Sequence, residues 1–242
     1  MDVSFRHIDE QTPDLESNAV HVWSAPLDRS CDAALLVESE RERSARFKME
    51  RIRNQYIAAR AQLRIVLGRY LDTDPVRVPI VYEASGKPIL DPNHDRGLHF
   101  NVSHSETLAV FAVTRRGRVG VDIERRRDIP NAESLVERFF TARERDLFLL
   151  LPECERLDAF FRAWTRKEAV LKAVGQGVQA LDQCDVTFGV DEPEAVLRMG
   201  DDLEARGKWL LRSWQPESGY DGAVAVELAS NGCLDSGERV GL

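Results

Sequence analysis

Two acidic side chains in the middle of the sequence are spaced for a metal site. Asp122 and Glu124 lie two residues apart in 119–124, an apolar stretch that predicts a strand. Alternate side chains of a strand share a face, so the two carboxylates lie side by side. A hard divalent cation with oxygen ligands relieves their repulsion, and Mg²⁺ suits a small site next to phosphates. The alternative is an exposed strand face neutralised by the three arginines at 125–127.

A third carboxylate lies on the apolar side of a predicted helix. Glu168 shares its arc of the helix with five apolar residues, Leu157, Phe160, Phe161, Trp164 and Leu171. An ionised, unpaired carboxylate on a buried face is strongly unfavourable, so Glu168 should be neutral or face a cation. Lys172 follows one turn later and can reach the same place. The helix therefore offers an acid and a cation to one site.

Several other positions offer donors to a phosphate. The segment Ser103-His104-Ser105 follows a predicted strand, and Lys87 lies in the turn Gly86-Lys87-Pro88. Both could equally be ordinary turns with local capping. Basic residues are also dense between 41 and 64, where we expect an anion site or a solvated helix face: Arg41, Arg43, Arg46, Lys48, Arg51, Arg53, Arg60 and Arg64.

The hydrophobic patterns predict an α+β fold. Helices are expected over 32–68, 135–140, 141–151 and 157–172, the third beginning with a capping box at Thr141 and Glu144. Strands are expected at 20–23, 76–80, 98–102, 108–113, 119–124, 186–188, 195–198, 209–214 and 223–228, with 108–113 and 119–124 paired as a hairpin. Ile129-Pro130 interrupts the pattern, which predicts an N-terminal half over 1–128 and a C-terminal half over 129–242.

Composition restricts the class of protein. With 43% hydrophobic and 31% charged residues in 242, the sequence is typical of a globular protein. A net charge of −8 argues against nucleic-acid binding. No apolar run reaches the length of a membrane span and no signal pattern opens the sequence, so we expect a cytoplasmic protein with no membrane partner. Four scattered cysteines argue for reduced thiols rather than zinc ligands or disulfides.

Five motifs in this order resemble the 4′-phosphopantetheinyl transferases, in particular the large, single-chain Sfp type. They are Gly86-Lys-Pro88, Phe100-Asn-Val-Ser-His-Ser105, Gly120-Val-Asp-Ile-Glu124, Arg138-Phe-Phe-Thr-x-x-Glu144 and Trp164-Thr-Arg-Lys-Glu-Ala-x-x-Lys172-x-x-Gly-x-Gly177. The resemblance covers 86–177; the remainder is similar only in general character. It implies two similar α+β halves related by a pseudo-two-fold, each a small antiparallel sheet packed with helices, with coenzyme A in the cleft between them.

The resemblance also implies a reaction and residue roles. The phosphopantetheine arm of coenzyme A would pass to a serine of an apo acyl, peptidyl or aryl carrier protein, releasing 3′,5′-ADP. Such enzymes activate non-ribosomal peptide, polyketide, siderophore or fatty-acid synthases, and the chain would act as a monomer. Asp122, Glu124 and Glu168 match the ligands of Mg²⁺, for which Mn²⁺ is an alternative. Lys87, Ser103 and His104 match residues that hold the phosphates of coenzyme A, and Lys172 matches the lysine that contacts its pyrophosphate. The chemistry of the transfer makes Glu168 the expected base for the carrier serine, with Lys172 and His104 neutralising charge on the phosphates. The family's arginine for the 3′-phosphate has no fixed motif here, and we expect Arg51, Arg53 and Arg60 collectively in that role.

Two further expectations concern partners and rival functions. Carrier proteins are acidic as a class, so a local basic or apolar docking patch is needed, and we expect it at Arg138, Phe140 and Arg143. The alternative function is a non-catalytic module that binds coenzyme A or a carrier protein on the same fold. A nucleotidyl or phosphoryl transferase of another class lacks support, because neither phosphate-binding glycine loop occurs.

Overall fold

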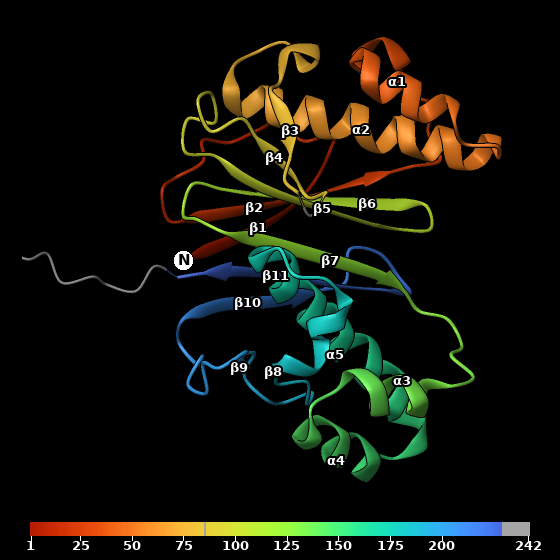
Figure 1. Ribbon diagram of the computed structural model, residues 1–242, viewed down its shortest axis with the longest axis vertical. Coiled ribbons are helices and arrows are strands. Elements are labelled where there is room, and N and C mark those ends of the chain that lie inside the picture. The colour runs from red at the N-terminus through yellow and green to blue at the C-terminus, as the bar shows by residue number, and fades with distance from the viewer. Residues whose placement is uncertain (85, 229–242) are drawn as a thin grey trace, which may run out of the picture.

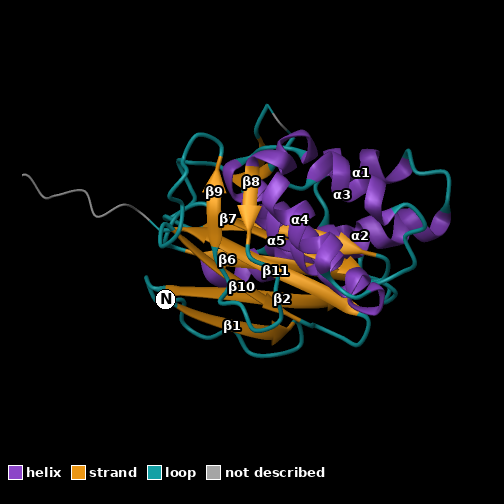
Figure 2. Ribbon diagram, turned by 90° about the horizontal axis from the view of Figure 1, so that it is seen from below, coloured by secondary structure: helices purple, strands orange, loops and turns teal. Residues whose placement is uncertain are grey.

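Four layers, in the order helix, sheet, sheet, helix, build the computed structural model, which describes residues 1–84 and 86–228 (Figure 1). The first sheet has the order β1-β2-β6-β5, with β1 at its outer edge (Figure 2). Its strands are β1 Asp2–His7, β2 Ala19–Pro26, β5 His99–Ser105 and β6 Leu108–Thr114. The second sheet has the order β10-β11-β7, formed by β7 Val119–Arg125, β10 Trp209–Trp214 and β11 Tyr220–Glu227.

The two sheets face each other across an apolar layer, and helices cover their outer faces. Val20, Val22 and Val110 of the first sheet pack with Val121 and Val224 of the second. Outside the first sheet lie α1 Glu38–Ala45 and α2 Glu50–Leu71; outside the second lie α3 Ala132–Phe139, α4 Ala142–Leu150 and α5 Glu153–Val174 (Figure 1). No helix in the part of the chain that the structure describes combines the length and apolar character needed to cross a membrane.

The same order of elements occurs twice. A first strand (β2 or β7) is followed by helices ending in one of 22 residues (α2 or α5), then by a small hairpin and a larger one. The small hairpins are β3 Ile80–Tyr82 with β4 Pro88–Leu90, and β8 Cys184–Val186 with β9 Val196–Met199. In both sheets the first strand of the repeat pairs antiparallel with its last, β2 with β6 and β7 with β11. The expected α+β fold of two similar halves is therefore confirmed, with β1 added parallel to β2.

Two predictions about strands were wrong. Strand β7 does not form a hairpin with β6: it pairs with β11, while β6 pairs with β2 and β5. The chain crosses between sheets because β7 can then bury its apolar face against the first sheet and its other face under α5. The strand expected at 76–80 is a 3₁₀ turn at Pro75–Arg77, since Asp74 caps Val76 and proline favours a first helical turn.

Strand β7 also bears on the expected division of the chain. It lies within 1–128 but hydrogen-bonds in the second sheet, and the division at 128 itself stays a prediction. Cys31, Cys154 and Cys184 are free thiols, whereas Cys233 lies outside the described residues.

Candidate active site

Helix α5 lies directly on strand β7, and Gly120 makes this contact possible. A Cβ at Gly120 would lie 2.0 Å from the carbonyl oxygen of Ala169 and 2.4 Å from the amide nitrogen of Ala173. Only glycine permits so close an approach of two backbones. Asp122 and Glu124 share the face of Gly120 because strand side chains alternate. The contact therefore places Glu168 and Lys172 of α5 beside the two carboxylates of β7.

Three elements converge on Asp122. The Nζ of Lys172 donates to Asp122 Oδ1 at 2.6 Å and to Ser103 Oγ at 2.9 Å. The hydroxyl of Ser103 in turn donates to Asp122 Oδ1 at 2.9 Å. A strand of the first sheet, a strand of the second and helix α5 thus share one hydrogen-bonded group.

Side chains rather than a backbone ladder connect β5 to β7 here. The Oδ1 atom of Asn101 accepts the N–H of Val121 at 2.9 Å, and the hydroxyl of Ser105 accepts the N–H of Arg125 at 3.1 Å. Between these two bridges lies Ser103, which is therefore held opposite Asp122. Sequence reasoning placed Asn101 in a motif without a role, and the structure shows that it joins the two sheets beside the site.

The carboxylates carry more negative charge than nearby cations neutralise. Burial, with the charge of Asp122 next, raises the pKa of Glu168 to about 7, although Lys172 opposes the shift. Burial and Asp122 also raise the pKa of Glu124. Moreover, the Oδ2 atom of Asp122 is buried without a hydrogen-bond partner among the described residues. Hard oxygen donors, repulsion and an orphaned buried oxygen fit a divalent cation.

The side chains of 1–84 and 86–228 nevertheless form no group of three or more His, Cys, Asp or Glu in an arrangement that could hold a metal. Lys172 instead bonds Asp122, and Arg127 lies 3.5 Å from Oε2 of Glu124. The three expected metal ligands therefore lie near one another and influence one another's pKa. That they bind one metal ion together stays a prediction.

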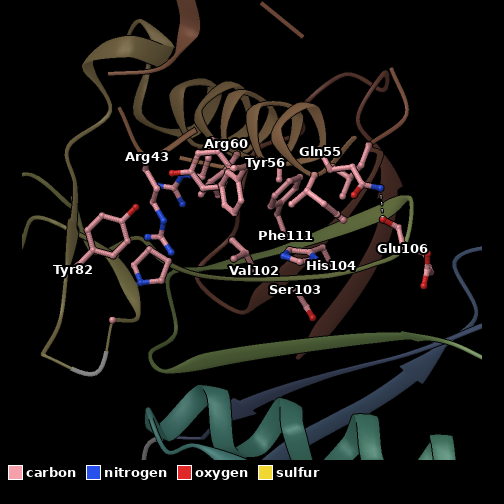
Figure 3. Close-up of a pocket in the computed structure, with 18 residues that line it drawn as sticks. Arg43, Gln55, Tyr56, Arg60, Tyr82, Val102, Ser103, His104, Glu106 and Phe111 are labelled. Atoms are coloured by element: carbon pink, nitrogen blue, oxygen red, sulfur yellow. Dashed lines mark hydrogen bonds between the residues drawn. The ribbon is translucent and has the colours of Figure 1, made fainter. Parts of the chain in front are cut away.

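A cavity of about 370 Å³ opens beside this group, between α2 and strands β5 and β6 (Figure 3). Its floor is apolar, with Val102 and Phe111 among the lining residues, and His104 lies along it (Figure 3). Desolvation and the charge of Lys172 lower the pKa of His104. Ser103 points away from the cavity toward Asp122, so β5 separates the cavity from the carboxylates and borders both.

Cations and aromatic rings gather at one end of this cavity. The guanidinium of Arg43 lies 5.7 Å from the centre of the Tyr56 ring, and that of Arg60 lies 5.7 Å from the Tyr82 ring. The buried hydroxyl of Tyr56 has no hydrogen-bond partner within the described ranges. This end can therefore accept a flat ring system and an anionic group.

Of the three arginines expected to hold a phosphate, only Arg60 lines the cavity. Its guanidinium also donates to Glu40 Oε1 at 2.9 and 2.7 Å. Arg51 is exposed, 3.9 Å from Glu106, and Arg53 donates to the carbonyl oxygen of Phe47. Arg43 also lines the cavity; the sequence placed it in the basic cluster but not among these three arginines, because nothing in the local pattern separates it from its basic neighbours.

Lys87, also expected at a phosphate, points elsewhere. Its Nζ donates to the carbonyl oxygens of Lys172 at 2.6 Å and Ala173 at 3.2 Å, at the C-terminal end of α5. Its neighbours Gly86 and Pro88 line the cavity instead. The structure thus brings Ser103 and Lys172 together, with His104 on the cavity side of β5 and Lys87 at the C-terminal end of α5.

Comparison with known proteins shows the family to which the chain belongs. The model of the 4′-phosphopantetheinyl transferase superfamily matches residues 118–225, and that of the N-terminal part of 4′-phosphopantetheinyl transferases matches 22–116. The chain is 38% identical over 218 residues to the 4′-phosphopantetheinyl transferase HetI of Nostoc sp., covering 88% of this chain and 89% of that protein. The chain belongs to the 4′-phosphopantetheinyl transferase superfamily.

Other members of the superfamily are similar over less of their length. A phosphopantetheinyl transferase of Thraustochytrium sp. is 27% identical over 86% of this chain and 79% of that protein. The human L-aminoadipate-semialdehyde dehydrogenase-phosphopantetheinyl transferase is 30% identical over 57% of this chain and 48% of its own length. Among solved structures, the holo-[acyl-carrier-protein] synthase of Thermotoga maritima matches 46% of this chain and 62% of that chain, at 20% identity and a TM-score of 0.35.

Of the docking patch expected on this transferase at Arg138, Phe140 and Arg143, the structure excludes Phe140. Phe140 is 2% exposed and stacks on Phe160 in a core. Arg143 binds Asp185 Oδ1 through Nη2 at 2.8 Å and so fastens α4 to β8. The Arg143 side chain is 34% exposed, so its part in docking, like that of Arg138, stays a prediction.

The fully buried pair of Lys167 and Glu144 is a second feature that sequence reasoning missed. Lys167 donates to Glu144 Oε2 and to the carbonyl oxygen of Cys184, while Glu144 also caps α4. These bonds hold the residue next to Glu168 against α4 and β8. The capping box identified Glu144 by its local role only, so its long-range partner was not predictable from spacing.

Proposed function

We propose that the chain transfers the 4′-phosphopantetheine arm of coenzyme A to a serine of an apo carrier protein, with Mg²⁺ bound at Asp122, Glu124 and Glu168 and with release of 3′,5′-ADP. The single observation that carries the proposal is the group of Ser103, Asp122 and Lys172 next to a cavity of nucleotide size. The superfamily supports coenzyme A and a carrier protein as the two substrates.

The cavity suits the nucleotide end of coenzyme A. Tyr56 and Tyr82 offer ring faces to the adenine, and Arg43 with Arg60 offers positive charge to the adenosine phosphate. The pyrophosphate then lies toward His104, Ser103 and Lys172, which are donors at the boundary of the two halves. Both halves belong to one chain, so a monomer can form the whole site.

Each group has a role in the transfer. The serine oxygen of the carrier attacks the phosphorus that bears the pantetheine arm, and the bridging P–O bond to 3′,5′-ADP breaks. Glu168, with a pKa raised to about 7, takes the serine proton. Lys172 and His104 donate hydrogen bonds to phosphate oxygens whose charge grows on the leaving group. When bound, Mg²⁺ supplies further charge neutralisation at the pyrophosphate.

A mass measurement tests the proposal. The protein is incubated with coenzyme A, Mg²⁺ and an apo carrier domain, and the carrier is weighed. A gain of one phosphopantetheine is the expected result. Binding of coenzyme A without a gain on several carriers would instead support a non-catalytic binding module on the same fold.

A further inference from the structure

Lys87 ends at the C-terminus of α5, the end of the helix that carries Lys172. The last carbonyl groups of a helix have no donors within the helix. In α5 the oxygen of Leu171 accepts the N–H groups of Gly175 and Gln176. The ammonium of Lys87 donates to the next two oxygens, those of Lys172 and Ala173, at 2.6 and 3.2 Å. A cation at this position also interacts favourably with the negative end of the helix dipole.

Lys87 lies on the hairpin β3–β4 of the first half, and its side chain contacts a helix of the second half. Tyr82 and Pro88, on either side of Lys87 in this hairpin, line the cavity proposed for coenzyme A. Lys87 itself borders a separate cavity of about 370 Å³ that Ala173 and Gly175 also line. One short hairpin thus forms a wall of the nucleotide cavity and fastens the end of α5.

Lys172 is consequently held at both its ends. Its Nζ is bonded to Asp122 and Ser103, and its main-chain oxygen is bonded to Lys87. The residue lies in the last turn of α5, where helices fray when their carbonyl groups lack partners. The direction of its side chain therefore depends on how firmly that last turn is held.

We propose that Lys87 is a positioning residue for the transfer reaction, which acts through Lys172 by holding the last turn of α5 and does not itself bind a phosphate of coenzyme A. The inference rests on the proposed function. A phosphate-binding lysine would set the affinity for the nucleotide, whereas a positioning residue sets the rate of the chemical step.

Lys87→Met separates the two roles, because methionine keeps an unbranched side chain and removes the donors. With the full chain, Mg²⁺, coenzyme A and an apo carrier, we expect kcat to fall roughly tenfold to a hundredfold, the cost of misplacing a group by about 1 Å. The KM for coenzyme A and the Kd of 3′,5′-ADP should not change. Lys87→Arg keeps donors at this position and should recover part of kcat. The control is Lys208→Met, which removes an exposed lysine paired with Asp202.

A double-mutant cycle shows whether Lys87 acts through Lys172. In a Lys172→Met background, Lys87→Met should cause no further loss of kcat, since the side chain that it positions is gone. Additive losses, or a raised Kd of 3′,5′-ADP with kcat unchanged, would overturn the proposal. Failure of the wild-type chain to modify any carrier would refute the proposed function instead.

Discussion

Replacing Gly120 by alanine tests whether the contact between α5 and β7 aligns the site. The new Cβ would meet the oxygen of Ala169 at 2.0 Å and the nitrogen of Ala173 at 2.4 Å. Both are backbone atoms, which cannot rotate away as a side chain can. Helix and strand must separate by about 1.4 Å, the difference between 2.0 Å and the 3.4 Å at which ordinary contact begins.

A separation of this size would break the hydrogen bonds that Lys172 makes to Asp122 and Ser103. Lys172 lies 2.6 Å from Asp122 and 2.9 Å from Ser103, so the same displacement takes both beyond hydrogen-bond distance. A misplacement of about 1 Å can cost a hundredfold in rate, and we expect at least about that loss in kcat. Overpacking should also lower the free energy of unfolding by about 1–3 kcal/mol.

The assay is carrier modification at saturating coenzyme A, with urea unfolding of the same samples. Gly189→Ala is a matched control, because its Cβ would approach nothing closer than 3.2 Å, a side-chain atom of Glu192. Wild-type kcat in a stably folded Gly120→Ala variant would refute the alignment argument. A loss of stability with kcat unchanged would show that Gly120 serves packing alone.

Three other substitutions test the remaining parts of the site and fold. Glu168→Gln removes the proposed base, so kcat should fall about a hundredfold or more while the Kd of coenzyme A, measured by calorimetry, changes little; an active variant would contradict the base role. Arg43→Ala should raise the KM for coenzyme A and spare the KM for the carrier, and an unchanged KM would exclude Arg43 from the nucleotide site. Burial would raise the pKa of Glu40, but hydrogen bonds from Arg64 and Arg60 lower it. The carboxylate therefore stabilises the fold above its unfolded pKa, and this stability is lost as pH falls through the folded pKa. Glu40→Gln should cost about 3–5 kcal/mol at pH 7 and progressively less below about pH 4, as urea unfolding at both pH values will show; an equal cost at both would contradict the ion-pair role.

The positions of site residues were predictable where they depend only on residue spacing within one strand or one helix. Spacing by two residues in a strand placed Asp122 and Glu124 on one face, and the apolar packing of Val121 on the other face confirms this. Spacing by four residues in a helix placed Glu168 and Lys172 on one side of α5. Each of these inferences needs only the geometry of one element.

Inferences that depend on a distant partner were not predictable. The arginine cluster gave no sign that Glu40 would bind both Arg60 and Arg64, because the ion pairs span 20 and 24 residues. The pairing of β7 with β11 joins segments about a hundred residues apart. In both cases tertiary packing overrides a local preference, here for solvated arginines and for a hairpin between consecutive strands.

The first repeat, like the second, has a hydrogen-bonded group between its first strand and its long helix. Tyr70, near the end of α2, is 2.7 Å from His21 and accepts a hydrogen bond from Trp23 at 2.8 Å, both on β2. Lys172, near the end of α5, bonds Asp122 on β7 in the same way. In both repeats the first strand contacts a polar side chain from the last turns of the long helix, through His21 and Trp23 in the first and through Asp122 in the second.

The groups around Tyr70 and Lys172 differ in their charge and in how fully their polar atoms are paired. Burial lowers the pKa of His21 and raises that of Tyr70 to about 12, so this group is neutral at physiological pH. Its hydrogen bonds join the three residues to one another within a packed core. In the second repeat, carboxylates at alternate positions of the first strand leave uncompensated charge and an orphaned oxygen at Asp122. One scaffold thus supports either a neutral or a charged hydrogen-bonded group between strand and helix, and the residue types at alternate positions of its first strand decide which.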